Sequence, residues 1–525
     1  MPKVLIADEL SMHAVAIFRR RGVEADVRTG LKPPELTAAI ADYDGLAVRS
    51  ATKVTAEILA AAPRLKVVGR AGIGIDNIDL PAATQRGIVV MNTPHGNSVT
   101  TAEHAIAMMM ALARQIPAAD KSTQAGKWEK SRFLGVELTG KTLGIVGCGN
   151  IGSIVAERAH GLKMKVIAFD PFLSDERARD LNVQKVALDE LLARADIVTL
   201  HTPLTDSTRN LLDAAALAKT KPGVRIVNCA RGGLVVEADL KAAIESGHVA
   251  GAALDVFAEE PARRNPLFGL DQVIATPHLG AATAEAQENV AVQIAEQMAD
   301  FLLTGAVSNA LNMPAVSAEE APKLRPYMTL AQQLGSFAGQ LTHSGLKSVT
   351  IEYEGQAAEL NTRPLTATAL AALLAPVLDS VNMVNAPLLA RERNIEVTEI
   401  KHDRPGDYQS LMRLAVATDR RTRDVAGTLF GGDKPRIVEI KGIRIEAELG
   451  RHMLYTTNED KPGFIGRLGT LLGEAGVNIA TFHLGRSAPG ADAIALIEVD
   501  QPLSDAQLAQ VRAIPGVVQA ESLVF

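Results

Sequence analysis

The chain has 525 residues, of which 47% are hydrophobic, 22% charged and only 3% aromatic, with a formal net charge of −6. This length exceeds what one hydrophobic core supports and predicts three or four domains, and the negative charge without a long basic run excludes a nucleic-acid-binding protein. The two cysteines, Cys148 and Cys229, form no zinc or redox motif, so we expect a reducing compartment, no disulfide scaffold and no metal site.

The N-terminal part alternates short apolar runs with helical stretches. Residues 3–8, 45–49, 66–69 and 88–91 read as buried strands, a pattern typical of a parallel sheet in an α/β fold. The apolar helical stretch at 102–113 is too short to span a bilayer, and no signal-peptide pattern precedes it. We therefore expect a cytoplasmic protein that has no membrane partner.

A second alternation of strands and helices begins at Leu143 with the sequence GIVGCGNIG. In this motif Gly147 allows a tight turn, Gly149 lets the backbone approach a pyrophosphate, and Gly152 lets the following helix pack closely on the sheet. The next strand ends in Asp170, whose carboxylate suits the adenosine ribose hydroxyls and repels a 2′-phosphate. The motif predicts an NAD-binding Rossmann unit, and the alternative is a structural glycine turn.

Three polar residues follow three later strands of this second unit. Arg231 follows VRIVNC, Glu260 follows AGAALDV, and His278 follows VIATP. Because ligands bind beyond the carboxyl ends of parallel strands, we expect the three side chains at one edge, beside the nicotinamide. A histidine can remove a hydroxyl proton, a carboxylate can hold its other nitrogen, and an arginine can anchor a substrate carboxylate. Each residue taken alone also fits a structural role.

The remainder of the chain has a different pattern. A long helix is expected over about 284–303, and Pro314 and Pro322 indicate a linker. Mixed helices and strands follow over about 323–445. Residues 450–525 show the order β-α-β-β-α-β, which predicts a ferredoxin-like module.

Several motifs resemble the D-isomer-specific 2-hydroxyacid dehydrogenase family. These are RGG (231–233), LDVFAEEP (254–261) and TPHLGA (276–281). Two further segments, GRAGIGIDNID (69–79) and MNTPHGNS (91–98), make the resemblance more specific. Within the family they resemble the branch with longer chains, which oxidises 3-phosphoglycerate with NAD in serine biosynthesis. The resemblance implies a flavodoxin-like substrate-binding domain (1–97 and 284–314), an inserted Rossmann domain (98–283), an α+β intervening regulatory domain of the allosteric substrate-binding type (315–449) and an ACT domain (450–525).

The resemblance also implies roles for individual residues. His278 is expected to be the general acid/base, Glu260 its partner, and Arg231 the anchor for the substrate carboxylate. Lys130 and Arg132 are expected either to reach a neighbouring subunit's site or to lie in a solvated loop. Arg49, Arg70 and Asn97, with Arg231 and His278, are expected to bind the substrate. The dinucleotide is expected to contact Gly147, Gly149, Asn150, Ile151, Gly152, Asp170, Thr202, Cys229, Asp255, His278 and Gly280, although Asn150 departs from the Arg or His of some relatives.

In the ACT segment, Asp460 and Asn478 match effector-contacting positions, and L-serine is the implied effector. Asn458 departs from the His or Tyr of relatives that bind serine, so a purely structural dimerisation module is the alternative.

The helices around 99–116 and 284–303 resemble dimer contacts, and we expect a homodimer or homotetramer. The alternative functions are another D-2-hydroxyacid dehydrogenase, acting on glycerate or lactate, and a non-catalytic NAD-sensing protein.

Overall fold

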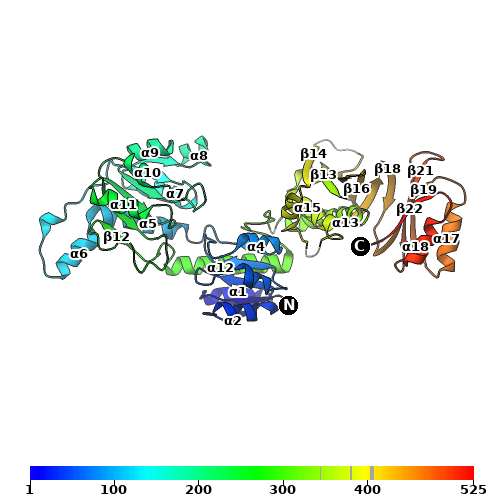
Figure 1. The fold of residues 1–525 in the computed structure, drawn as a ribbon, viewed down its shortest axis with the longest axis horizontal. Coiled ribbons are helices and arrows are strands. Elements are labelled where there is room, and N and C mark those ends of the chain that lie inside the picture. Colours follow the sequence, from blue (N-terminus) through cyan, green and yellow to red (C-terminus); the bar gives the residue numbers. More distant parts are fainter. Residues whose placement is uncertain (318, 343–344, 379–380, 403–406) are drawn as a thin grey trace.

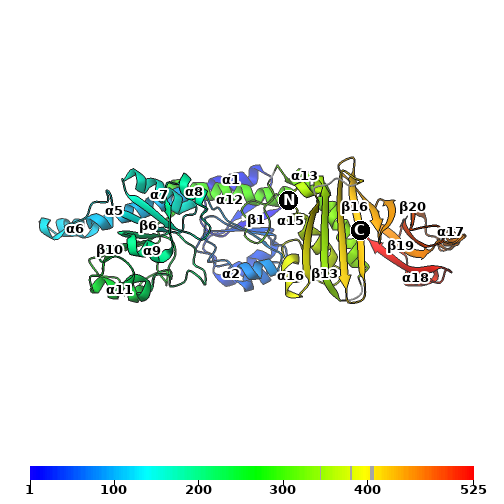
Figure 2. The ribbon, with the colours of Figure 1, turned by 90° about the horizontal axis from the view of Figure 1, so that it is seen from above.

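The computed structural model describes residues 1–317, 319–342, 345–378, 381–402 and 407–525. Four β-sheets follow one another along an elongated molecule (Figures 1 and 2). The sheet of the N-terminal residues lies between the glycine-motif unit and the C-terminal half. Within the described ranges, no helix combines the length and the apolar character that crossing a bilayer requires.

The first sheet is parallel and has the order β2-β1-β3-β4-β5, which is the flavodoxin-like order. Helix α1 and the long helix α12 pack on one face, and α2, α3 and α4 pack on the other. Gly69 permits the close approach of α12, since a Cβ there would lie 2.2 Å from the Met298 sulfur. The elements are β1 (Lys3–Ile6), α1 (Met12–Arg20), β2 (Glu24–Val27), α2 (Pro33–Ala39), β3 (Gly45–Val48), α3 (Ala56–Ala60), β4 (Val67–Arg70), α4 (Leu80–Gln85), β5 (Val89–Met91) and α12 (Ala284–Thr304).

The second sheet is also parallel, with the order β12-β11-β10-β9-β6-β7-β8. Numbered from its own first strand, this is the Rossmann order 3-2-1-4-5-6 with one strand added at the edge. Helices α5, α7 and α8 cover one face, and α9, α10 and α11 cover the other. The elements are α5 (Ser98–Arg114), α6 (Ile116–Gln124), β6 (Thr142–Val146), α7 (Asn150–Gly161), β7 (Lys165–Phe169), α8 (Asp175–Asp180), β8 (Gln184–Lys185), α9 (Leu188–Arg194), β9 (Ile197–Leu200), α10 (Ala214–Ala218), β10 (Val224–Asn228), α11 (Glu237–Glu245), β11 (Val249–Leu254) and β12 (Val273–Ala275).

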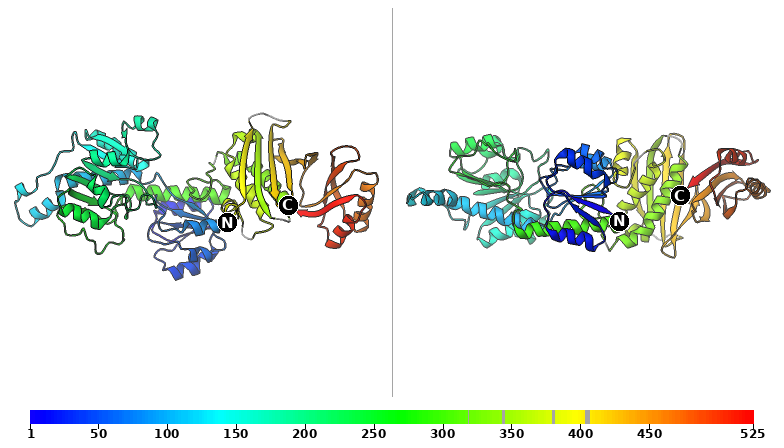
Figure 3. Two further views of the ribbon diagram at one scale, coloured as in Figure 1. Left: turned by 45° about the horizontal axis from the view of Figure 1, so that its top comes forward. Right: turned by 90° about the horizontal axis from the view of Figure 1, so that it is seen from below.

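The third sheet is mixed and has the order β14-β13-β15-β16-β17-β18. Its strand pair β13–β14 is parallel, and the other pairs are antiparallel. Helices α13 and α15 cover one of its faces (Figure 3). The elements are α13 (Ala321–Gln340), β13 (Leu346–Gly355), α14 (Gln356–Glu359), α15 (Arg363–Leu374), α16 (Ala386–Glu392), β14 (Glu396–His402), β15 (Ser410–Thr418), β16 (Thr422–Phe430), β17 (Lys434–Ile440) and β18 (Ile443–Ala447).

The fourth sheet is antiparallel, with the order β20-β21-β19-β22, and two helices pack on one face. The chain order β-α-β-β-α-β is that of a ferredoxin-like module, consistent with an ACT domain. The predicted fold class is therefore confirmed. The elements are β19 (His452–Glu459), α17 (Phe464–Glu474), β20 (Ile479–Arg486), β21 (Asp492–Val499), α18 (Asp505–Arg512) and β22 (Val517–Val524).

Candidate active site

Arg231, Glu260 and His278 follow β10, β11 and β12, which are neighbours in one parallel sheet. Since parallel strands end at a common edge, the three loops leave the sheet on the same side. This is the edge at which the glycine-rich turn after β6 also lies. The sheet topology therefore gathers the expected catalytic residues at one end of the unit.

Glu260 and His278 form the central pair of this edge. The distance between the Glu260 Oε2 and the His278 Nδ1 is 2.7 Å, and the backbone N–H of Phe257 donates to the Glu260 Oε1 at 3.0 Å. Burial acts to raise the Glu260 pKa, but the bonds from His278 and Phe257 outweigh it and leave this pKa below its ordinary value. The carboxylate thus stays ionised and accepts from Nδ1, so the imidazole presents Nε2 as the free nitrogen.

Asp255 holds the loop that carries His278. Its side chain is fully buried, and its two carboxylate oxygens accept from the Thr276 hydroxyl (2.6 Å) and from the backbone N–H groups of Leu279 (2.7 Å) and Gly280 (2.8 Å). Burial acts to raise the Asp255 pKa, but the bonds from His104, Thr276 and Leu279 lower it below its ordinary value. Asp255 therefore lies beneath the loop, and direct contact with a dinucleotide stays a prediction.

Arg231 contacts a residue of the first sheet's unit that the sequence did not indicate. Its Nε donates to the Asp76 Oδ2 at 2.9 Å, and its Nη1 donates to the carbonyl oxygen of Ala230 at 2.6 Å. Gly74 leaves room for the guanidinium, because a Cβ there would lie 1.8 Å from the Arg231 Nη2. The Arg231–Asp76 ion pair thus joins the two α/β units across the site.

Arg70 and Arg49 lie close to this ion pair. Arg70 ends β4, and burial, followed by the charge of Arg231, lowers its pKa from 12.5 to about 10. The Arg70 Nε is buried and has no hydrogen-bond partner among the described residues. Arg49 follows β3, and its Nη1 reaches only the carbonyl oxygen of Glu9, at 3.4 Å. Two guanidiniums with spare donors therefore lie near Arg231.

Asn97 precedes α5 at the junction between the two units. It is buried, and its side-chain oxygen Oδ1 has no partner among the described residues. A buried amide oxygen without a partner costs free energy unless a ligand or water supplies a donor. Such an atom suits a substrate hydroxyl.

The glycine-rich turn has the geometry that the sequence motif predicts. Gly147 has φ +91°, and a Cβ there would lie 2.6 Å from the His201 carbonyl oxygen. At Gly152 a Cβ would lie 2.1 Å from the Gly147 carbonyl oxygen, which lets α7 pack against the turn. At Gly149, by contrast, an added Cβ would meet no atom within 4 Å. The first and third glycines serve packing, and the second leaves space above the helix N-terminus, which fits a pyrophosphate.

Asp170 follows β7 beside this turn. Its Oδ2 accepts from the Cys148 N–H at 2.8 Å, and its Oδ1 accepts from the Phe172 N–H at 2.8 Å. These two bonds fix the carboxylate at the carboxyl end of β7, where ribose hydroxyls would meet it. The arrangement of the glycines and of Asp170 therefore fits NAD.

The other residues expected at the dinucleotide differ in exposure. Ile151 and Thr202 are half-buried, whereas Cys229 is buried, which raises the pKa of its thiol. The exposed Asn150 donates from Nδ2 to the Pro94 carbonyl oxygen at 3.4 Å, across the gap between the two α/β units. Their contacts with a dinucleotide stay predictions.

The loop with Lys130 and Arg132 extends from the second unit beyond α6. Arg132 forms ion pairs with Asp271 (2.7 Å) and Glu129 (3.2 Å) of its own chain. A role for either residue at a neighbouring subunit's site stays a prediction.

Asp460 and Asn478 lie at opposite ends of the fourth sheet. Asp460 follows the end of β19, beside the start of β21, whereas Asn478 precedes β20, beside the end of β21. Since β21 has eight residues that rise about 3.3 Å each, these ends lie about 23 Å apart. One small ligand can therefore contact both positions only if the second belongs to another copy of the chain.

Within the chain, both positions already have partners. The Asp460 Oδ2 accepts from the Arg486 Nη1 at 2.8 Å, and the Asn478 Nδ2 donates to the Asp500 Oδ2 at 2.9 Å. Asn458 is buried, and its Oδ1 lacks a partner among the described residues.

Comparisons with known proteins cover both halves of the chain. The model of the D-isomer specific 2-hydroxyacid dehydrogenase NAD-binding domain matches residues 106–280, and that of the D-3-phosphoglycerate dehydrogenase intervening domain matches residues 323–441. The chain is 44% identical over 522 residues to D-3-phosphoglycerate dehydrogenase from Synechocystis sp., covering 99% of this chain and 94% of that protein. It is 42% identical to the enzyme of the same name from Archaeoglobus fulgidus, covering 99% of each.

Solved structures resemble the N-terminal part. The TT0316 protein of Thermus thermophilus is 35% identical with a TM-score of 0.55, covering 59% of this chain and 99% of that one. D-lactate dehydrogenase from Aquifex aeolicus, complexed with NAD and lactic acid, is 25% identical with a TM-score of 0.53, covering 59% and 100%.

Proposed function

The chain belongs to the D-3-phosphoglycerate dehydrogenase family, and from this membership we infer that it oxidises 3-phospho-D-glycerate to 3-phosphohydroxypyruvate with NAD, the first step of phosphorylated serine biosynthesis. The chain is thus an NAD-dependent oxidoreductase that acts on a secondary alcohol. The observation that best supports chemistry at the proposed site is the 2.7 Å Glu260–His278 contact at the carboxyl ends of the parallel strands.

We propose that His278 removes the hydroxyl proton of the substrate through Nε2. Glu260 accepts the bond from Nδ1, which fixes the tautomer that leaves Nε2 able to take a proton. When bound, NAD takes up the hydride from the carbon that bears this hydroxyl. In the reverse direction the protonated His278 returns its proton to the carbonyl oxygen. Asp255 contributes by holding the His278 loop in place through three hydrogen bonds.

The substrate's two anionic groups need separate cations. We propose that Arg231 binds the carboxylate, with its Nη2 directed to the substrate while Asp76 holds its Nε edge. Arg70 and Arg49 then bind the phosphate, and the unpartnered Arg70 Nε supports this role. The unpartnered Asn97 Oδ1 accepts from a substrate hydroxyl. Dehydrogenases for glycerate or lactate would have no use for the two additional guanidiniums.

Asp170 accounts for the choice of cofactor. Its carboxylate, held by two backbone N–H groups, would accept from ribose hydroxyls and repel a 2′-phosphate. We propose contacts to the pyrophosphate from the backbone at Gly147, Gly149, Asn150, Ile151 and Gly152, and further contacts from Thr202, Cys229, Asp255 and Gly280.

We propose that the units have separate tasks. Residues 1–97 with 284–314 bind the substrate, residues 98–283 bind NAD, and residues 315–449 and 450–525 regulate the enzyme. L-serine is the proposed effector, bound between Asp460 of one copy and Asn478 of another, because the strand register separates these positions within one chain. This proposal requires at least a homodimer, and a homotetramer also satisfies it.

The test is NADH formation, followed by absorbance, with 3-phosphoglycerate, D-glycerate and D-lactate in turn. We expect 3-phosphoglycerate to be preferred, and we expect the preference to shrink in Arg70→Ala. His278→Ala serves as the control for catalysis and should lose about 100- to 10,000-fold in rate. Equal turnover of D-glycerate would indicate another D-2-hydroxyacid dehydrogenase, and a wild type as inactive as His278→Ala would indicate an NAD-sensing protein.

A further inference from the structure

The third sheet carries a group of nitrogen and oxygen ligands that the oxidoreductase reaction does not use. Glu352 and Glu354 lie two residues apart on β13, and His402 ends the neighbouring strand β14. The register pairs Glu354 directly with His402. Because Ile351 and Tyr353 are buried in the core with α13 and α15, the alternating Glu352 and Glu354 lie on the opposite face of the sheet.

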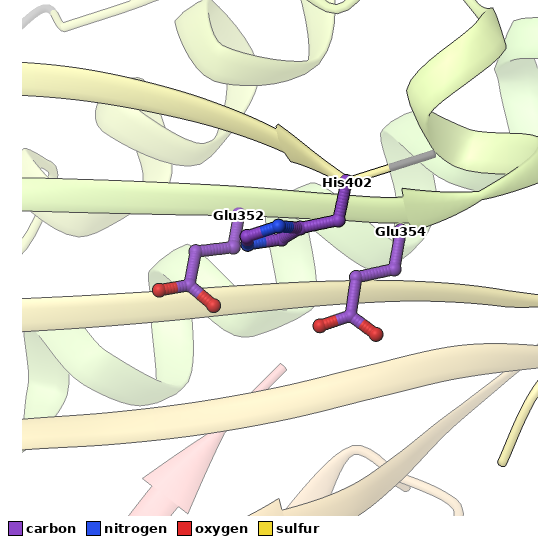
Figure 4. Close-up of side chains that lie close together, drawn as sticks. All are labelled: Glu352, Glu354 and His402. Atoms are coloured by element: carbon purple, nitrogen blue, oxygen red, sulfur yellow. The ribbon is translucent and has the colours of Figure 1, made fainter. Parts of the chain in front are cut away.

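The side chains of these three residues converge. One ligand atom from each, two carboxylate oxygens and one imidazole nitrogen, lies within 4.8 Å of the others. Figure 4 shows the imidazole of His402 reaching toward Glu352, with both carboxylates on the same face of the sheet. Two paired strands fix the backbone positions from which these side chains extend.

The electrostatics of this face favour an additional cation. The guanidinium of Arg413 is occupied by Glu439, to which it donates at 2.6 and 3.2 Å, and by Asp424 at 3.1 Å. Its Nε remains 3.8 Å from the Glu352 Oε2. In the part of the chain that the structure describes, no hydrogen bond or ion pair engages the side chains of Glu354 or His402. Among the described residues, Arg413 thus contacts three carboxylates, of which Glu439 also lies in the field of Arg444, whereas Glu354 takes part in no ion pair.

We propose that Glu352, Glu354 and His402 bind a divalent transition-metal cation of the zinc class. An imidazole nitrogen with two carboxylates suits Zn²⁺, Co²⁺ or Ni²⁺, whereas Mg²⁺ and Ca²⁺ prefer oxygen ligands alone. Three protein ligands leave coordination positions for water, in keeping with the position of the site on an open sheet face. The cation adds a side-chain link between β13 and the edge strand β14, beyond their backbone pairing.

The test begins with the full-length protein, stripped of metal with a chelator and dialysed. Titration with Co²⁺, followed by its ligand-field absorbance, and calorimetry with Zn²⁺ should each give one site per chain. We expect His402→Ala and Glu354→Gln to weaken that binding by at least 10- to 100-fold, since losing a direct ligand costs no less than losing a supporting contact. Zn²⁺ should also slow amide exchange in β14 of the wild type but not of His402→Ala.

His13→Ala provides a matched control, because His13 is an exposed histidine on helix α1 that contacts one carboxylate, that of Glu288 on helix α12. This variant should bind Zn²⁺ as the wild type does. The proposal is overturned if His402→Ala retains wild-type affinity and stoichiometry, if His13→Ala loses as much affinity as His402→Ala, or if the wild type binds no Zn²⁺. NADH formation by metal-free His402→Ala should equal that of the metal-free wild type, because His402 lies outside the oxidoreductase site.

Discussion

The substitution Gly149→Ala should weaken the binding of NADH while leaving the protein folded. Gly149 precedes α7 with a negative φ of −77°, and an added Cβ there meets no atom within 4 Å. Alanine is a weaker helix N-cap, which should lower the free energy of unfolding by less than about 1 kcal/mol. The new methyl group instead occupies the open space above the helix N-terminus in which we propose that the pyrophosphate binds.

The expected effect on affinity follows from the hydrogen bonds that the methyl group disrupts. Moving the pyrophosphate away from the backbone weakens at least one bond between an N–H and a charged oxygen, and such bonds contribute about 1.5 to 3 kcal/mol. The Kd for NADH should therefore rise about 10- to 150-fold.

Fluorescence titration with NADH measures the Kd, and thermal unfolding measures the stability. Gly161→Ala, at the other end of α7, also places a Cβ in open space and should change neither quantity adversely. Gly147→Ala should instead destabilise the fold, because its φ is +91° and its Cβ would lie 2.6 Å from a carbonyl oxygen. A folded Gly149→Ala protein whose Kd for NADH lies within twofold of the wild type would refute the proposed cofactor position.

Three further predictions concern the substrate side. Glu260→Gln removes a charge-assisted bond to His278 and should lower kcat/KM about 10- to 100-fold with little change in the Kd for NADH; an unchanged kcat/KM would contradict the proposed pair. Asp76→Asn removes the partly exposed ion pair with Arg231 and should raise the KM for 3-phosphoglycerate by less than about fivefold at constant kcat. The control Asp79→Asn also removes one negative charge but keeps a helix cap, and it should change neither kcat nor this KM. Arg70 is charged below its lowered pKa of about 10, so the KM for 3-phosphoglycerate should rise as the pH passes 10 while that for D-glycerate does not; parallel rises would argue against phosphate binding by Arg70.

The apolar runs of the sequence predict most strands of the two parallel sheets, including the edge strands β5 and β12, but they do not predict the edge strands β2 and β8. Strand β2 has the sequence EADV, with exposed ends, and β8 has only two residues, so neither forms an apolar run. Their pairing with β1 and β7 comes from tertiary structure and is invisible to local periodicity. By contrast, β3 is buried along its whole length and coincides with the apolar run 45–49 that predicts a strand.

At the proposed site, too, some residues could be predicted from the sequence and others could not. Glu260 and His278 could be inferred because each follows a strand, and strand ends in a parallel sheet share one edge. Asp76 could not, because it lies in an irregular loop of the other unit and approaches Arg231 only through the packing of two units. The burial of Asp255 beneath the His278 loop was likewise not apparent from its place after β11, since the direction of a side chain in a loop has no fixed period.

Helix α12 begins shortly after the His278 loop and leads toward the C-terminal half of the chain. With 21 residues it forms a rod of about 31 Å, and about two-thirds of the way along it packs Met298 against Gly69, next to Arg70. A stiff rod cannot tilt at one end alone. Movement of α12 would therefore displace both the loop that carries His278 and the strand that ends in Arg70, so the helix couples the two sides of the proposed site mechanically.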